Sequence, residues 1–236
     1  MRVFTVCLFV VLTALSVFAE TPTFPPDYPQ SLERELAALL EVRSQKSEDP
    51  SFLLKLAGTY FDMGNDLLTD NEKRIMAYGE AARLAQHALE LKEADAEAHF
   101  LYAAALGKAA ELKGITASLL SLEEMRMHVT RALELQKDHV PAIHMVGMML
   151  EELPRFMGGN PEAALEYLER AVTLDPTYTH ARLDLAKMYA KRKKTELAKR
   201  ELLAIVNMDH PRDPYAWAKE YRPEAERLLE SLTHAK

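Results

Sequence analysis

The sequence contains a single cysteine, few glycines and no excess of positive charge. Its 236 residues include one Cys and eight Gly, and 36 Asp and Glu outnumber 29 Lys and Arg, for a net charge of −7. An acidic chain lacks the basic surface that binds phosphate groups, so we expect no nucleic-acid partner. Hydrophobic residues make up 48% of the chain. With so little glycine, this composition favours helices around a buried core rather than disorder.

The N-terminus has the pattern of a secretory signal. Residues 3–18 carry no charge, and Ala19 follows them as a small residue before Glu20. This pattern predicts a signal peptide over residues 1–19 that is cleaved near Ala19, with an uncleaved membrane anchor as the alternative. Cys7 lies inside the apolar run, so the mature chain would have no thiol and no lipid-modified cysteine. The predicted location is therefore the periplasm or the exterior, with membrane contact only if the segment stays attached.

Small side chains recur through the helical part of the chain. The 34-residue tetratricopeptide unit is a pair of helices that cross closely at small residues. The small positions of the first helices, at 57, 103, 147 and 186, are 46, 44 and 39 residues apart. The final-turn positions of the second helices, at 88, 132, 171 and 205, are 44, 39 and 34 apart. The pattern predicts an all-α, tetratricopeptide-like solenoid of helical hairpins, with an unrelated helical bundle as the alternative.

The predicted repeat domain covers residues 31–236. Its units are expected at about 50–95, 96–139, 140–178 and 179–212. Only the last spacing has the standard length, so the other units should carry inserts between their helices, around 64–73, 112–121 and 151–156. An amphipathic helix over 31–46 and a capping helix over 214–233 would flank the units. Residues 20–30 hold four prolines, which predicts an extended tether.

Five short segments between residues 50 and 232 carry more information than the repeat spacing alone. They are Tyr78-Gly79-Glu80-Ala81-Ala82, Ala88-Leu89-Glu90-Leu91, Ala96-Glu97-Ala98-His99, Lys113-Gly114-Ile115 and Arg131-Ala132-Leu133-Glu134-Leu135. Together with the insert positions, they resemble the regulator-of-microtubule-dynamics family and its exported bacterial relatives. The resemblance implies the tetratricopeptide fold. It implies microtubules for the eukaryotic members only, so that activity is not carried over behind a bacterial-type signal.

Residues 153–160, Leu-Pro-Arg-Phe-Met-Gly-Gly-Asn, form a second motif. This segment is similar to a Pro-x-x-x-Gly-Gly turn in the T component of TRAP transporters, a periplasmic helical-repeat protein. That resemblance implies an alternative function, a transporter accessory that binds or shields a small ligand. The residues themselves favour a tight turn, in which Gly158 and Gly159 reach positive φ before the helix cap Asn160, over a phosphate cradle.

The sequence shows no pattern of catalytic or metal-binding residues. None of the eight histidines falls in a His-x3-His or His-Glu-x2-His pair. Adjacent acids such as Glu151 and Glu152 point to different sides of a helix and predict solvated faces. We therefore expect no enzyme, no cofactor and no metal. The basic run at 191–194 predicts a solvated turn, with an anionic docking patch as the alternative.

A binding groove is expected on the concave face, which the first helices of such solenoids line. The predicted groove residues are Leu54, Phe61, Phe100, Ala104, His144, Met148, Leu183 and Lys187. Leu, Phe and His occupy the positions at which carboxylate-clamping repeats carry Lys and Asn, so that clamp is not expected.

Several occupants fit such a groove. The first hypothesis is an interaction scaffold that binds a peptide or protein segment. A small apolar ligand would fit the transporter-accessory alternative. A third hypothesis is a homo-oligomer formed through the inserts. Finally, the helix at 31–46 or the tether at Phe24-Pro25-Pro26 could fill the apolar end from within the same chain.

Overall fold

The computed structural model describes residues 26–234, and every regular element in that range is helical. The prediction of an all-α fold is therefore confirmed, while the predicted signal peptide lies outside the described residues. The helices are α1 (Ser31–Val42), α2 (Pro50–Asp62), α3 (Asn71–Leu91), α4 (Ala96–Lys113), α5 (Ile115–Leu135), α6 (Val140–Glu152), α7 (Pro161–Leu174), α8 (Thr179–Lys191), α9 (Thr195–Val206), α10 (Pro214–Ala216) and α11 (Arg222–His234). Shorter turns of helix are η1 (Arg43–Gln45), η2 (Met63–Leu67), η3 (Arg155–Met157) and η4 (Trp217–Tyr221).

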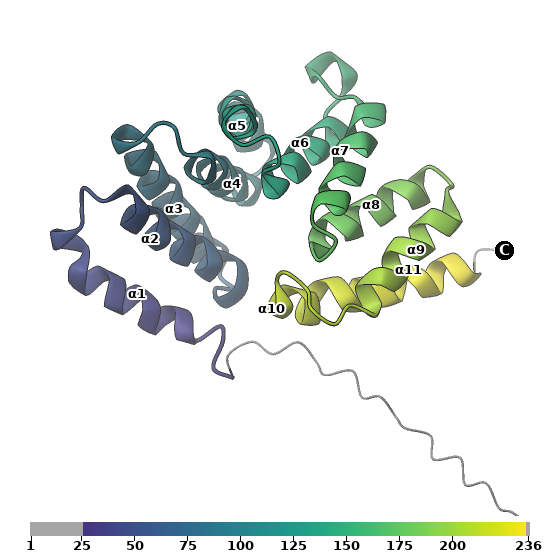
Figure 1. The fold of residues 1–236 in the computed structure, drawn as a ribbon, viewed down its shortest axis with the longest axis horizontal. Coiled ribbons are helices and arrows are strands. Elements are labelled where there is room, and N and C mark those ends of the chain that lie inside the picture. Colours follow the sequence, from purple (N-terminus) through teal and green to yellow (C-terminus); the bar gives the residue numbers. More distant parts are fainter. Residues whose placement is uncertain (1–25, 235–236) are drawn as a thin grey trace, which may run out of the picture.

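The helices pack as successive hairpins, α2 with α3, α4 with α5, α6 with α7 and α8 with α9. The hairpins follow one another along an arc, and its two ends, α1 and α10, approach each other (Figure 1). The predicted unit starts, 50, 96, 140 and 179, coincide with the first residues of α2, α4, α6 and α8. In the described range, 26–234, no helix is both long and apolar enough to cross a bilayer.

Side-chain caps explain where several of these helices begin. Asp49, Asp70, Asp95 and Asn160 each stand before a helix and accept a hydrogen bond from a backbone N–H of its first turn. Such a cap contributes about 1 kcal/mol by satisfying an N–H that has no partner within the helix. His139 serves α6 in the same way, with its Nδ1 accepting from the N–H of Ala142 at 3.2 Å.

The small positions lie where the helices of each hairpin touch. Ala57, Ala103 and Ala186 have no exposed surface, and Gly147 is buried as well. A Cβ added at Gly147 would overlap the side chain of Leu168 on α7. Close approach of the two helices therefore requires these small residues, as the spacing predicts.

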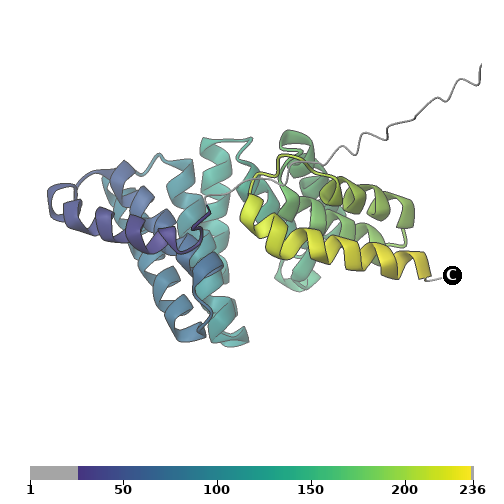
Figure 2. The ribbon, with the colours of Figure 1, turned by 90° about the horizontal axis from the view of Figure 1, so that it is seen from below.

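The insert predicted around 112–121 is not a loop. Helices α4 and α5 are instead lengthened, to 18 and 21 residues, and only Gly114 separates them. Figure 2 shows the long blue and teal helices of this part projecting beyond the rest of the arc. The extension leaves Ile115 and Leu120 81% exposed. Gly114 permits the junction because its φ of 102° is closed to other residues.

The other two inserts are compact turns. Around 64–73, η2 packs against the fully buried Tyr78, whose hydroxyl donates to Asn65 Oδ1 at 2.8 Å. In the third insert Gly158 has a φ of 93°. A Cβ at Gly159 would collide with the backbone of Leu153. The expected tight turn is confirmed, with positive φ at Gly158 but not at Gly159, where close approach to the Leu153 backbone explains the glycine instead.

The described end of the predicted tether differs from the extended expectation. Residues 26–30 form a turn that leads into α1, with Pro29 buried. The Tyr28 hydroxyl donates a hydrogen bond to Asp66 of η2, and its ring lies edge-on to that of Tyr215 in α10, with centroids 4.9 Å apart. These contacts hold the segment against both ends of the arc, so it does not extend into solvent. We call this junction the clasp.

Carboxylates gather around the clasp. Burial raises the pKa of Asp62 to about 7, and the neighbouring charges of Asp66, Asp213 and Glu35 add to the shift. Burial also raises the pKa values of Asp66 and Asp213. The hydrogen bond from Tyr28 opposes this rise at Asp66, and the positive charge of Arg212 opposes it at Asp213. Deprotonating these three carboxyl groups together is therefore unfavourable while the clasp is formed.

The clasp should make stability depend on pH. Folded Asp62 keeps its proton up to about pH 7 against an ordinary pKa of 3.8, so its contribution is present at low pH and lost as pH rises through this window. We expect Asp62→Asn to raise the melting temperature at about pH 8, by on the order of 2 °C, because the residue still contacts solvent, which screens the charges around its partly desolvated carboxyl. Thermal unfolding at about pH 5.5 and about pH 8 measures the change. Asp209→Asn, in the exposed loop after α9, is the matched control. An unchanged pH slope for Asp62→Asn would contradict the prediction.

Candidate functional site

The apolar end of the predicted groove is partly occupied by the chain itself. Leu54 and Phe61 are half-buried and pack against the first core cluster, where Leu36 and Val42 of α1 also lie. Phe100 is half-buried too, with its ring 5.2 Å from that of His139. Helix α1 therefore adds apolar side chains to the cluster against which this end of the predicted groove packs. This arrangement agrees with the alternative in which the helix at 31–46 fills the apolar end from within the same chain.

The remaining predicted groove residues lie in different environments. Ala104 and Met148 are half-buried, and Met148 packs against the second core cluster. Leu183 is 3% exposed and packs with Trp217 under the C-terminal helices. Lys187 keeps 45% of its side chain exposed, and its Nζ lies 3.8 Å from Glu224 Oε1.

Leu183 and Lys187 meet residues of the C-terminal cap in an open hollow of about 650 Å³ between α8 and η4–α11. We call it the cap hollow. Its lining is Leu183, Lys187, Lys219, Glu220, Pro223, Glu224 and Arg227. Three cations and two carboxylates thus surround two apolar side chains. Such a surface can bind an oxygen-bearing group beside an apolar one.

A second constellation, which we call the histidine cluster, joins α6 to α8. His144 Nε2 lies 2.8 Å from Asp184 Oδ2, and His180 Nε2 lies 3.5 Å from the same oxygen. The Tyr178 hydroxyl contacts His144 Nδ1 at 3.2 Å. On the other side the ring of Tyr221 stacks on His180, with centroids 5.1 Å apart and planes at 12°. One donor atom from each of the two histidines and Asp184 lies within 4.8 Å of the others, so these residues could hold a metal ion.

The electrostatics of the histidine cluster favour a neutral His180 beside a charged Asp184. Loss of hydration lowers the pKa of His180 to about 4, and the neighbouring His144 adds to the shift. Burial alone would raise the pKa of Asp184, but the hydrogen bond from His144 and the nearby His180 outweigh it and lower the pKa. Burial raises the pKa of Glu152, and the charge of Asp184 contributes. Groups from α4 also act here, because Lys108 lowers the pKa of His180.

Among these residues, only His144 is a groove residue predicted from the sequence. His180 and Asp184 are four residues apart on α8 and share a helix face, so a search for mixed His-x3-Asp pairs finds half of the cluster. The partnership with His144 arises from the packing of α6 beside α8 and has no local signal. Tyr221 comes from η4, in a segment expected only to cap the solenoid.

The strongest charge run of the sequence makes internal contacts. Lys191 Nζ and an Arg192 guanidinium nitrogen donate to the two carboxylate oxygens of Glu151 at 2.8 and 2.7 Å. Lys194 lies over the ring of Tyr189. The run therefore ties unit four to unit three.

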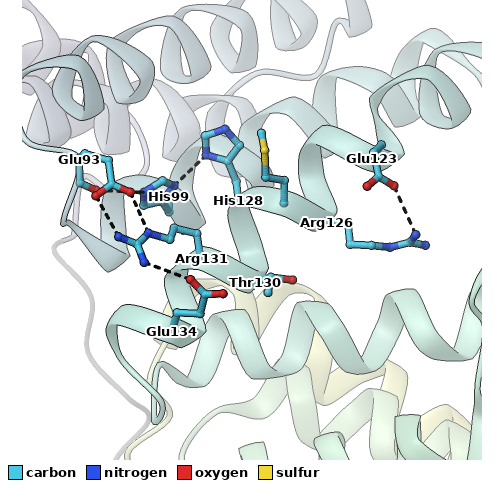
Figure 3. A pocket seen from close by; sticks show the side chains of 9 residues that line it. Glu93, His99, Glu123, Arg126, His128, Thr130, Arg131 and Glu134 are labelled. Carbon is cyan, nitrogen blue, oxygen red and sulfur yellow. Dashed lines mark hydrogen bonds and ion pairs between the residues drawn. The ribbon is translucent and has the colours of Figure 1, made fainter.

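A further hollow of about 520 Å³ opens on the surface of α4 and α5 (Figure 3). Arg131 donates to both carboxylate oxygens of Glu93, at 2.8 and 3.0 Å, and to Glu134 at 3.1 Å. His99 Nδ1 and His128 Nδ1 lie 2.9 Å apart, and burial together with His99 lowers the pKa of His128. Figure 3 shows these groups turned toward one another, so their charges are compensated within the protein.

Comparison with solved structures supports the fold. A thermophilic TPR protein from Thermus thermophilus superposes with a TM-score of 0.61 over 86% of this chain and 91% of its own, at 14% identity. Residues 156–220 match the tetratricopeptide repeat family. The tetratricopeptide prediction is therefore confirmed.

Sequence comparison identifies the branch of these repeat proteins. Regulator of microtubule dynamics protein 1 from Bos taurus is 30% identical over 72% of this chain, and the Mus musculus protein is 29% identical over 72%. The chain spans 61% of the mouse relative and 58% of the bovine one. Residues 27–150, more than half of the chain, match the family model of regulator of microtubule dynamics proteins 1–3. The chain therefore belongs to this family, as the motif resemblance predicts.

Proposed function

We propose that the protein is an interaction scaffold that binds a peptide or protein segment on its concave face, at the cap hollow. The tetratricopeptide fold and the family membership support a role in protein interaction. The observation that carries the proposal is the hollow itself, because two predicted groove residues line it together with the cap. Its volume is in the range of ligand sites, and it stays open while the other end of the groove is partly covered.

The chemistry of the hollow defines the segment that fits. Lys187 and Lys219 are exposed cations on its rim, and the exposed Pro223 offers carbon surface beside them. Glu224 pairs with Lys187 and also with Arg227. A carboxylate of the bound segment could take the place of the Glu224 side chain beside Lys187 and Arg227 and so balance their positive charge. The expected partner is therefore a segment with an acidic residue next to an apolar one.

The proposed location is the periplasm, reached through cleavage of the signal near Ala19. The apolar run of residues 3–18 supports export. Mass spectrometry of the mature chain tests this location, since cleavage would leave Glu20 at the N-terminus. An intact N-terminus on the purified native protein would contradict it.

Charge reversal at the hollow tests the function. Full-length protein panned against a random peptide display library should enrich sequences with adjacent acidic and apolar residues. Fluorescence anisotropy with an enriched peptide should show about tenfold weaker binding by Lys187→Glu, the effect of about 1.4 kcal/mol from replacing attraction by repulsion. Lys137→Glu, the same change at an exposed turn between α5 and α6, should bind as the wild type does. Enrichment of peptides that both variants bind equally well would contradict binding at the cap hollow.

A further inference from the structure

The histidine cluster goes beyond what a peptide-binding groove requires. His144 and Asp184 have side-chain exposures of only 7% and 12%, whereas His180 keeps 39%. The cluster therefore has a buried side, formed by His144 and Asp184, and an open side that is reached past His180. Buried polar side chains of this kind cost free energy unless their interactions compensate for lost hydration.

The spacing of the donor atoms suits a small divalent ion. Bonds of about 2.0 Å in a tetrahedral site place neighbouring ligand atoms about 3.3 Å apart. The two separations from Asp184 Oδ2, 2.8 Å to His144 Nε2 and 3.5 Å to His180 Nε2, lie on either side of that value. All three donor atoms lie within 4.8 Å of one another, so small side-chain rotations would bring them into coordination.

The surroundings supply the supporting contacts that metal-ligating histidines need. Without a metal, His144 Nε2 donates to Asp184. When a metal takes the place of that proton, the imidazole carries its proton on Nδ1, where the Tyr178 hydroxyl can accept it, and Nε2 ligates. The stack of Tyr221 on His180 fixes the orientation of the second imidazole. Carboxylate Glu152 faces Asp184 and adds negative charge, against the cations Lys108 and Lys187.

We propose that His144, His180 and Asp184 form a site for one divalent transition-metal ion, with zinc as the ion that fits best. Two imidazole nitrogens and one carboxylate oxygen are borderline ligands that favour zinc over calcium or magnesium, which prefer all-oxygen shells. The fourth position lies on the side of the partly exposed His180 and can take water or a donor atom of a bound segment. The ion would join α6 to α8, and so tie unit three to unit four.

Calorimetric titration tests the site. Untagged full-length protein, stripped with a chelator and dialysed, is titrated with zinc chloride at about pH 7.5, because protons compete less with the metal for its ligands than at lower pH. We expect one equivalent to bind and to raise the melting temperature. His180→Gln removes a ligand from a half-exposed position, so the fold should persist while zinc affinity falls by more than about tenfold. Circular dichroism of the metal-free variants verifies folding.

Two further variants separate this site from incidental binding. His210→Gln changes an exposed histidine in the loop after α9 and should bind zinc as the wild type does. Asp184→Asn, which keeps the shape of the carboxylate, should weaken binding as His180→Gln does. Tetrahedral Co²⁺ absorption in the wild type and its loss in His180→Gln would locate the ion. Equal zinc affinity in wild type, His180→Gln and His210→Gln would overturn the proposal, as would the lack of a saturable equivalent in the wild type.

Discussion

Trp217→Ala should lower the free energy of unfolding by about 3–5 kcal/mol, the range for removing a buried aromatic ring from a packed core. Trp217 is 4% exposed, and its indole N–H donates to the carbonyl of Ile205 at 2.8 Å. The ring packs with Leu183 and Leu202, which belong to the two helices of unit four. Because domains of this kind have only about 5–15 kcal/mol in total, this one side chain should account for much of the stability.

The same substitution should separate the cap from the repeats. In a solenoid each unit contacts only its neighbours, so weakening the last interface lets the end unfold before the rest. Urea unfolding followed by far-ultraviolet circular dichroism should change from one transition to two. Dichroism is the suitable probe because Trp217 is the only tryptophan of the chain, and the substitution removes the fluorescence signal.

Trp217→Phe serves as the control for this experiment. Phenylalanine keeps most of the apolar ring but loses the N–H, which leaves the Ile205 carbonyl without this donor. The expected loss is about 1–3 kcal/mol, smaller than for alanine. If both variants unfold in a single transition at the wild-type urea concentration, the cap does not stabilise unit four.

The repeat architecture could be predicted because its cause is local in the sequence. Ala57, Ala103, Gly147 and Ala186 are small because two backbones approach each other there, and the structure shows each of them buried. Asn160 before Pro161 similarly indicated the start of α7, since a cap and an initial proline act within a single turn. Signals that act over one turn or one hairpin remain legible in a single sequence.

Features that depend on distant parts of the chain could not be predicted in this way. The clasp brings together Tyr28 and Tyr215, which are far apart in the sequence. Nothing in the sequence around either residue indicates contact with the other. The lengthening of α4 and α5 is another case, because extra residues between two helices are as compatible with a loop as with additional helical turns. Gly114 allows the chain to turn directly from one helix into the next, because its φ of 102° is open to glycine. That angle is known only from the structure.

The proposed binding surface shares two residues with the groove predicted from the sequence. Repeat geometry placed Leu183 and Lys187 on the first helix of unit four, and both line the cap hollow. It gave no information about the cap residues opposite, because Lys219 and Arg227 belong to no repeat. At the other end, Leu54 is half-buried and packs against the same core cluster as residues of α1, a helix that lies outside the repeats.

Gly114→Ala should lower the free energy of unfolding by about 1–3 kcal/mol, through backbone strain alone. A Cβ at Gly114 would have no atom within 4 Å, so crowding does not oppose the substitution. However, a φ of 102° with a ψ of 179° is a region that essentially only glycine occupies. The Gly114 N–H donates to Ala110 and Glu111, and its carbonyl accepts from the N–H of Ser118. Relieving the strain would therefore disturb the end of α4 and the start of α5 together.

Gly79→Ala is the matched control, because it adds the same methyl group inside helix α3. Gly79 is exposed, has helical backbone angles and would also bring no atom within 4 Å of the new Cβ. Alanine should stabilise this position by about 0.5–1 kcal/mol, since it restricts the unfolded chain and favours the helix. Urea unfolding followed by dichroism should thus shift in opposite directions for the two variants. A shift in the same direction for both would mean that the α4–α5 junction adopts another backbone conformation in solution.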